Sequence, residues 1–241
     1  MKLSDIKNEY TLNIFTDGSM SHNVGSKNIP VGCSGAVIVD HNENTNYYTH
    51  IIENCTNNIA ELMAIYLGID MVLRNYNYTM YKINLFSDSL VSINSLKDWI
   101  YNWKQNKRGL YINSSGKPVA NQDIITRIVS LICNSNLAIT FYHQKGHIDY
   151  RSLSKGVMTF KKTNNIKDYV DMDVIKYISS YNEFIDNRTR CELINYQIQD
   201  NTLQLPYVLL LTDEMKNKLQ NKTNAKQTQN QPYYYVGDDE I

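Results

Sequence analysis

The chain has 241 residues, of which 42% are hydrophobic and 20% are charged, and its 24 basic and 24 acidic side chains cancel to zero net charge. This composition is typical of a globular protein with one good core. The zero net charge excludes a strong overall field that would attract a polyanion, so a nucleic-acid surface would need local clusters of Lys and Arg. No apolar run is long enough to span a membrane and no signal peptide opens the chain, so we expect no membrane partner.

The four cysteines are scattered along the chain, with no Cys-x-x-Cys pair. This distribution favours reduced thiols over disulfides or a zinc site. We therefore expect an intracellular protein of the cytoplasm or nucleus. The frequent Asn and the 19 Tyr residues indicate AT-rich coding, which leaves a virus-encoded origin open.

The first part of the chain predicts an antiparallel meander. Apolar runs bounded by turn residues predict strands at residues 10–16, 35–39 and 47–52. A polar stretch over residues 20–30 predicts a long turn between the first two strands. Closely spaced turns of this kind connect antiparallel neighbours.

A helix is expected after the meander. Thr56 or Asn57 can cap its start, and apolar residues from Ile59 to Ile69 follow helical spacing. Glu61 falls in its first turns. Strands and helices then alternate, which predicts an α/β fold with a five-stranded mixed sheet flanked by helices. The later elements that we expect are strands at residues 81–86 and 138–142, helices at residues 90–103 and 119–133, and a loop at residues 104–117.

The C-terminal third is more polar and rich in Lys. It predicts a weakly amphipathic helix at about residues 168–178 and a last helix at residues 181–199. We expect one domain over residues 1–200, with an insertion at 148–181, and a partly disordered extension at 201–241. The basic residues of the insertion could make it an extra lid, although a solvated excursion explains them equally well.

Acidic residues stand where two of the predicted core strands end. Asp17 follows the first strand and Asp88 the fourth, while Glu61 lies in a helix start that could face the same edge. Clustered carboxylates repel one another unless a cation neutralises them. Oxygen ligands without Cys or His select Mg²⁺ or Mn²⁺. Two such ions about 4 Å apart suit the attack of water on a phosphodiester.

Short motifs run in a fixed order along residues 10–195. They are Thr16-Asp17-Gly18-Ser19, Thr56-Asn57-Asn58-Ile59-Ala60-Glu61-Leu62, Ser87-Asp88-Ser89, residues 99–104, Gly116-Lys117-Pro118-Val119-Ala120-Asn121, Lys145-Gly146-His147 and Asn182-Glu183-Phe184-Ile185-Asp186. Each motif is weak alone, but together and in this order they resemble ribonuclease H of the type 1 class. Members of that family cleave the RNA strand of RNA–DNA hybrids, so the resemblance implies a hybrid as the partner and a ribonuclease H-like fold.

The resemblance implies a catalytic quartet of metal-binding carboxylates: Asp17, Glu61, Asp88 and Asp186. The quartet would hold two Mg²⁺ ions, with Mn²⁺ as a substitute, for hydrolysis that leaves 5′-phosphate ends. It also implies that His147 helps proton movement or product release, a role that suits an imidazole because it titrates near neutrality. Asp186 enters only through the Asn-Glu-x-x-Asp motif.

The resemblance also implies how the hybrid is bound. Asn57 and Asn58 would meet RNA 2′-hydroxyls in the minor groove, and Thr56 and Asn121 match positions that hold a DNA phosphate. The chain departs from the family pattern at Asn54, where Arg is frequent.

A basic protrusion is implied for the region that contains Trp103, Lys104, Lys107 and Arg108. Local positive charge interleaved with aromatic side chains suits contact with the nucleic-acid backbone and sugars. Leu110 stands where the family usually has an aromatic residue. We expect Trp99, by contrast, to belong to the core.

Two other interpretations stay open. A hybrid-binding module that no longer cleaves would be favoured by loss of one quartet acid, and none is lost. A related two-metal nuclease that acts on DNA, such as a junction resolvase, is disfavoured by Asn57 and Asn58, because DNA offers no 2′-hydroxyl.

Overall fold

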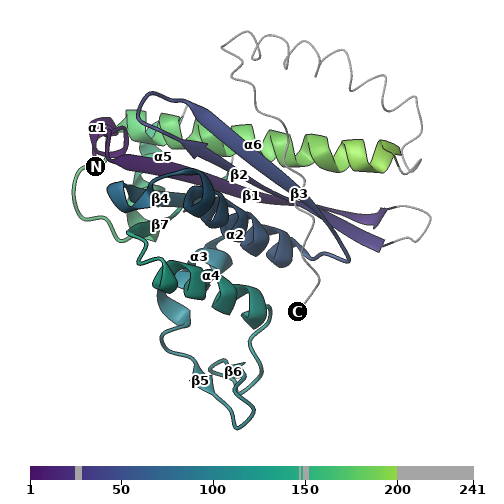
Figure 1. Cartoon of the computed structure of the whole chain (residues 1–241). Coiled ribbons are helices and arrows are strands. Elements are labelled where there is room, and N and C mark those ends of the chain that lie inside the picture. The colour runs from purple at the N-terminus through teal and green to yellow at the C-terminus, as the bar shows by residue number, and fades with distance from the viewer. Residues whose placement is uncertain (25–28, 147, 149–151, 200–241) are drawn as a thin grey trace.

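A single five-stranded sheet forms the centre of the computed structural model, which describes residues 1–24, 29–146, 148 and 152–199 (Figure 1). The strands are β1 (Thr11–Val24), β2 (Ile29–Val39), β3 (Thr45–Glu53), β4 (Lys82–Ser87), β5 (Lys104–Gln105), β6 (Tyr111–Ile112) and β7 (Ile139–His143). The helical segments are α1 (Leu3–Ile6), α2 (Asn57–Asn75), η1 (Tyr78–Met80), α3 (Leu90–Asn94), η2 (Ser95–Trp99), α4 (Gln122–Asn134), α5 (Leu153–Thr163) and α6 (Met172–Gln199).

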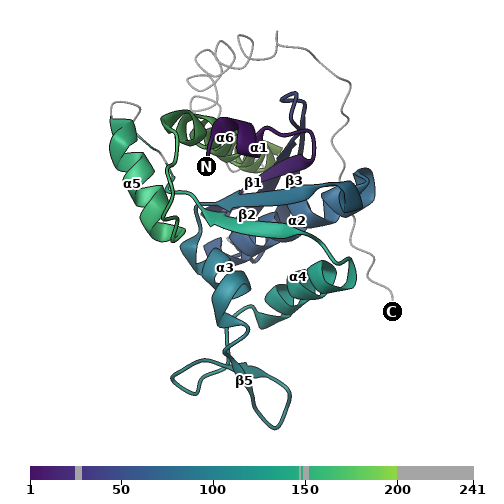
Figure 2. The same cartoon turned by 90° about the vertical axis from the view of Figure 1, so that its left-hand side faces the viewer.

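The sheet is mixed, with the order β3-β2-β1-β4-β7. Strands β3, β2 and β1 pair antiparallel, and β1, β4 and β7 pair parallel. The predicted five-stranded mixed α/β sheet is therefore confirmed. Strands β5 and β6 form a separate two-stranded sheet at the end of a protrusion, well away from α6 (Figures 1 and 2).

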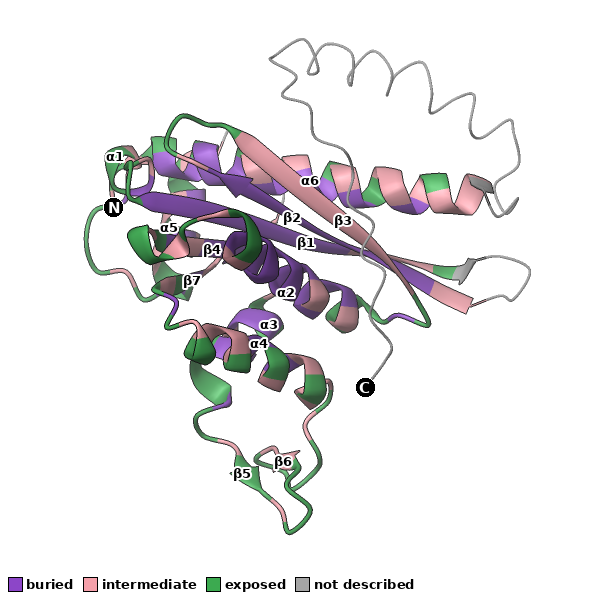
Figure 3. Cartoon of the chain, viewed as in Figure 1, coloured by how far each residue is buried: buried purple, intermediate pink, exposed green. Residues whose placement is uncertain are grey.

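The central strand β1 is covered on both faces, as the burial colours in Figure 3 show. Successive strand residues point to opposite faces, so Leu12 and Ile14 join the cluster under α2, whereas Phe15 joins the cluster under α6. All three side chains are fully buried. Helices on both faces of the sheet thus hold the strand that carries the acidic motif.

The turn predicted at residues 20–30 is wrong over much of its length. Strand β1 continues to Val24 and β2 already begins at Ile29. The two strands stay paired through Ser21 and Val31, with a register shift beyond that point. Ladder hydrogen bonds satisfy the backbone whatever the side chains are, so polar residues can extend a strand that projects beyond the core.

The two helices predicted at residues 168–178 and 181–199 are one continuous helix, α6. The helix runs without interruption through Ser179 and Ser180, where Ser180 Oγ donates to the carbonyl of Tyr177 at 2.9 Å. The insertion predicted at 148–181 therefore ends within this helix. The predicted extension at 201–241 lies outside the described residues.

The helix predicted at residues 90–103 is shorter than expected, because α3 passes into the π-helical segment η2. This segment turns Leu96 and Ile100 into the core, with 2% and 8% exposure, and leaves Trp99 41% exposed. The prediction that Trp99 belongs to the core is wrong. The loop predicted at residues 104–117 contains the short strands β5 and β6.

Helix α5 is packed onto the rest of the domain. Phe160 is 3% exposed within the cluster under α6. Asn164, just after α5, accepts from the backbone N–H of His143 at 2.7 Å and donates to the carbonyl of the same residue at 2.8 Å. The amide thus pairs with the edge strand β7 as another strand would. Within the described residues, no helix has the length and apolar character that crossing a membrane requires.

Replacing Asn164 by Ala should lower the free energy of unfolding by about 2 kcal/mol, because it leaves the part-buried backbone N–H and carbonyl of His143 without this partner. Denaturant unfolding followed by circular dichroism measures this change. The exposed Asn134 of α4 provides the control, since Asn134→Ala should stay within about 0.5 kcal/mol of the wild type. Equal stabilities of the two variants would contradict a structural role for the Asn164 amide.

Candidate active site

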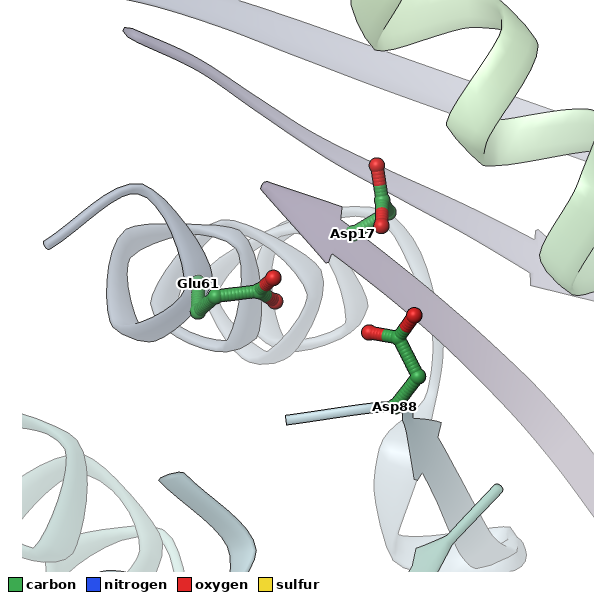
Figure 4. Close-up of side chains that lie close together, drawn as sticks. All are labelled: Asp17, Glu61 and Asp88. Carbon is green, nitrogen blue, oxygen red and sulfur yellow. The ribbon is translucent and has the colours of Figure 1, made fainter. Parts of the chain in front are cut away.

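Three carboxylates converge where β1, α2 and the end of β4 meet (Figure 4). Oxygen atoms of Asp17, Glu61 and Asp88 all lie within 4.8 Å of one another. The parallel pairing of β1 with β4 ends at Thr16 and Ser87. Asp17 and Asp88 are the residues that follow this pair, so they lie side by side. Sheet register therefore brings together two acids that are far apart in sequence, as predicted, although Asp17 lies within β1 and does not end it.

The third acid reaches the cluster because α2 begins very close to β1. A Cβ atom at Gly18 would lie 2.5 Å from the backbone nitrogen of Glu61 and 2.6 Å from the carbonyl carbon of Ala60, so only glycine fits at this contact. The backbone N–H of Gly18 also interacts with the Glu61 carboxylate and opposes the rise in its pKa. The Asp-Gly-Ser motif thus supplies one carboxylate of the cluster and makes room for another.

Asp17 is 5% exposed and is held by a hydroxyl from α6. Thr189 Oγ1 donates to Asp17 Oδ2 at 2.9 Å, and Ser19 Oγ lies 2.7 Å from Thr189 Oγ1. The sequence interpretation did not include Thr189. Its spacing of three residues from Asp186 on one helix was the signal that could have placed it on the same face.

The backbone at Asp88 is fixed by His143 at the end of β7. His143 Nε2 donates to the Asp88 carbonyl at 3.1 Å, since a carbonyl oxygen can only accept. Burial lowers the pKa of His143, against the opposing effect of this hydrogen bond and of the Asp88 charge. The sequence interpretation assigned no role to this histidine.

Burial and mutual repulsion perturb the acids strongly. Burial and the nearby Asp88 raise the pKa of Asp17 to about 6, against the opposing effect of the Thr189 hydrogen bond. The pKa of Glu61 is raised well above its ordinary value by burial and then by Asp17 and Asp88. The cluster therefore resists carrying its full negative charge without a cation.

The donor set fits a divalent cation. Glu61 Oε2 is buried and has no hydrogen-bond partner among the described residues, although buried polar atoms are nearly always satisfied. Asp17, Glu61 and Asp88 offer only carboxylate oxygens, the ligands of Mg²⁺ and Mn²⁺. These residues could hold such an ion, which would relieve both the repulsion and the unsatisfied oxygen.

Asp186 lies beside this cluster but is not one of its three members. It is 8% exposed on α6, and Arg190 Nε contacts its Oδ1 at 2.8 Å. Its charge is close enough to raise the pKa values of Asp17 and Glu61. Its metal-binding role stays a prediction. His147, the predicted proton-transfer residue, lies outside the described residues.

The start of α2 carries the residues predicted to meet RNA. Thr56 caps the helix by accepting from the Ile59 N–H at 3.3 Å, and Asn57 and Asn58 are its first two residues, both exposed. Glu61 follows them by four and three residues, a spacing that places all three on one side of the helix. The two amides therefore lie next to the acidic cluster.

The predicted basic residues lie on the separate protrusion formed by β5 and β6. Lys104, Lys107 and Arg108 are exposed, and Trp103 is half-buried with its ring centroid 6.0 Å from that of Tyr111. A cavity of about 590 Å³ opens beside them, lined in part by Trp99. Asn121 precedes α4 in the left-handed conformation, at φ 55°. The nucleic-acid contacts of these residues stay predictions.

Comparison with known proteins gives consistent matches. The RNase H family model matches residues 9–154, a segment that includes the three clustered acids and ends before Asp186. Ribonuclease H of Prosthecochloris aestuarii is 31% identical over 166 residues, which is 68% of this chain and 94% of the relative.

Other similar proteins match in part. Ribonuclease H of Tropheryma whipplei is 41% identical over 93 residues, which is 38% of this chain. The chain spans about half the length of that relative, 53%. Among solved structures, the LC11 RNase H1 isolated from compost by a metagenomic approach has a TM-score of 0.42 and 17% identity. That match covers 65% of this chain and 96% of the other.

Without metal, Asp17→Asn should stabilise the protein above pH 6. The pKa of Asp17 is raised from 3.8 to about 6, so the folded state keeps a proton that the unfolded chain has lost, and stability falls as pH rises through this window. The neutral amide removes this cost, so the variant should gain about 1–3 kcal/mol at pH 8 and progressively less toward pH 4. Urea unfolding in EDTA at both pH values measures the gain.

The exposed Glu9 provides the control for this experiment, because Glu9→Gln removes an acidic charge that is in contact with solvent. Its stability should differ from that of the wild type by no more than about 0.5 kcal/mol at either pH. If Asp17→Asn changes the stability at pH 8 no more than this control does, burial and repulsion by the neighbouring carboxylates do not destabilise ionised Asp17.

Proposed function

The chain belongs to the ribonuclease H family, and we propose on this premise that it is a metal-dependent endonuclease that hydrolyses the RNA strand of RNA–DNA hybrids. The observation that carries the proposal is the convergence of Asp17, Glu61 and Asp88 within 4.8 Å. A family member that had lost cleavage would have no need to keep three clustered acids, two of them buried, whose repulsion costs stability.

The roles of the acids follow from how each is held. Asp17 is placed by a central strand and a buried hydroxyl, and Glu61 by the close approach of α2 to Gly18. Asp88 has a fixed backbone but a half-exposed side chain. Two rigid ligands beside a more accessible one leave an open side toward which a phosphodiester can be bound and oriented.

Two bound Mg²⁺ ions, or Mn²⁺ in their place, would activate a water molecule and stabilise the leaving oxygen, which gives 5′-phosphate products. Asp186 is the proposed fourth ligand. Its ion pair with Arg190 keeps the carboxylate on the face of α6 that carries Thr189, beside the cluster. Release of that ion pair would free both oxygens of Asp186 for coordination.

Asn57 and Asn58 are proposed to select the RNA strand. Their exposed amides stand one helical turn before Glu61, so a 2′-hydroxyl bound there would lie close to the reacting phosphate. The protrusion with Trp103, Lys104, Lys107 and Arg108 would bind the DNA backbone farther along the duplex, where contact requires charge more than rigid geometry.

Asp17→Asn should reduce cleavage of a labelled RNA–DNA hybrid by about 10³-fold or more. The amide keeps the shape and can still accept from Thr189, but it loses the charge that holds the cation, which is worth about 4 kcal/mol at the transition state. The measurement is a single-turnover cleavage rate in Mg²⁺, with an EDTA arm. Glu9→Gln should cleave like the wild type. Cleavage by Asp17→Asn at the wild-type rate would contradict the proposed metal-dependent mechanism.

Replacing Asn57 and Asn58 together by Ala should raise the KM for the hybrid about tenfold, since each lost polar contact costs about 0.7 kcal/mol. The kcat should change by less than about twofold, because neither side chain holds the metal. Steady-state kinetics with RNA–DNA and DNA–DNA duplexes measures both. The exposed Asn42, in the turn between β2 and β3, offers a control in Asn42→Ala. A wild-type chain that prefers the DNA duplex would instead support a DNA nuclease.

A further inference from the structure

The hydroxyl groups of Ser19 and Thr189 form a hydrogen-bonded series that ends on the carboxylate of Asp17. Thr189, on α6, is fully buried, and its Oγ1 lies 2.9 Å from Asp17 Oδ2 and 2.7 Å from Ser19 Oγ. Ser19 Oγ itself is 3.5 Å from Asp17 Oδ2, at the limit of a hydrogen bond. Thr189 is therefore the closer hydroxyl partner of this carboxylate.

The number of available protons decides which group donates in each of these hydrogen bonds. The single Thr189 hydroxyl proton has two acceptors in reach, Asp17 Oδ2 at 2.9 Å and the carbonyl of Asp186 at 3.0 Å. An ionised carboxylate is the stronger acceptor and has no proton to give. Thr189 thus donates to Asp17, and Ser19 donates to Thr189.

Packing fixes the position of Thr189 independently of these bonds. A Cβ atom at Gly35 would lie 2.4 Å from Thr189 Cγ2 and 2.9 Å from Ile185 Cδ1, so α6 rests directly on the backbone of β2. Gly35 is the ladder partner of Asp17 in the β1–β2 pair. The hydroxyl is consequently held by the sheet residue that lies next to its target.

We propose that Thr189 is a positioning residue that locks the Asp17 carboxylate in its metal-binding orientation. Its hydrogen bond holds Asp17 Oδ2, and Figure 4 shows one oxygen of the Asp17 carboxylate directed toward Asp88. The inference rests on the proposed metal-binding role of Asp17. It extends that role to a residue that touches neither metal nor substrate.

Two pairs of variants isolate the hydroxyl. Thr189→Val is compared with the wild type, and Thr189→Ala with Thr189→Ser, so that the members of each pair have similar size. Outer-shell partners typically change metal affinity by 10–100-fold, so loss of the hydroxyl should weaken Mn²⁺ binding about tenfold in each pair. Titration calorimetry of the full chain with Mn²⁺, without nucleic acid, measures the affinity.

Tyr177→Phe is the matched control because it removes another buried hydroxyl from the same helix. Tyr177 OH accepts from Asn13 at 3.2 Å, about 18 Å along the helix axis from Thr189. Its Mn²⁺ affinity should equal that of the wild type. Thermal unfolding of every variant in EDTA separates a loss of fold from a loss of metal binding. If Thr189→Val does not fold, the comparison of Thr189→Ala with Thr189→Ser still tests the hydroxyl.

A cleavage assay adds a second readout. In the hydroxyl-free variants the Mg²⁺ concentration for half-maximal cleavage should rise about tenfold, while kcat at saturating Mg²⁺ recovers and KM for the hybrid stays constant. Equal Mn²⁺ affinity within both pairs would overturn the positioning role. A wild-type chain that binds Mn²⁺ but does not cleave hybrid would overturn the proposed function and leave the Thr189 inference standing on the affinities.

Discussion

Repulsion among three clustered carboxylates, two of them buried, is the constraint on which the rest of the structure depends. Asp17, Glu61 and Asp88 would separate if their backbones were free, because each loses hydration and faces like charges. They are held by the parallel β1–β4 register, by the absent side chain of Gly18 and by α6 above β1 and β2. The fold thus stores an unfavourable local interaction that a divalent cation would turn into a favourable one.

The positions of Asp17 and Asp88 could be predicted together because each follows an apolar run and the two runs pair in parallel, although β1 itself continues past Asp17. Glu61 could be predicted because helix spacing and a cap are local signals. Asp186 was found by motif alone, and its relation to the cluster depends on where a distant helix crosses the sheet. The helical spacing of Thr189 from Asp186 places the two on one face, but its partner Asp17 is 172 positions away, so this spacing does not identify the contact.

Three of the predicted features differ from the structure. The polar residues of 20–24 were interpreted as part of a turn, but pairing with β2 supplies their backbone with partners and overrides the local preference. The predicted boundary between residues 178 and 181 lies inside the continuous helix α6, where Ser180 bonds to Tyr177. Trp99 was assigned to the core, whereas the π-helical segment leaves it 41% exposed.

The amide of Asn164 has a consequence for the behaviour of the protein in concentrated solution. Strand β7 is an edge of the sheet, and open edges template pairing with other molecules. Asn164 occupies both backbone hydrogen-bonding groups of His143, so an incoming strand finds no free donor or acceptor there. Asn164 therefore blocks the addition of another strand at this position of the edge.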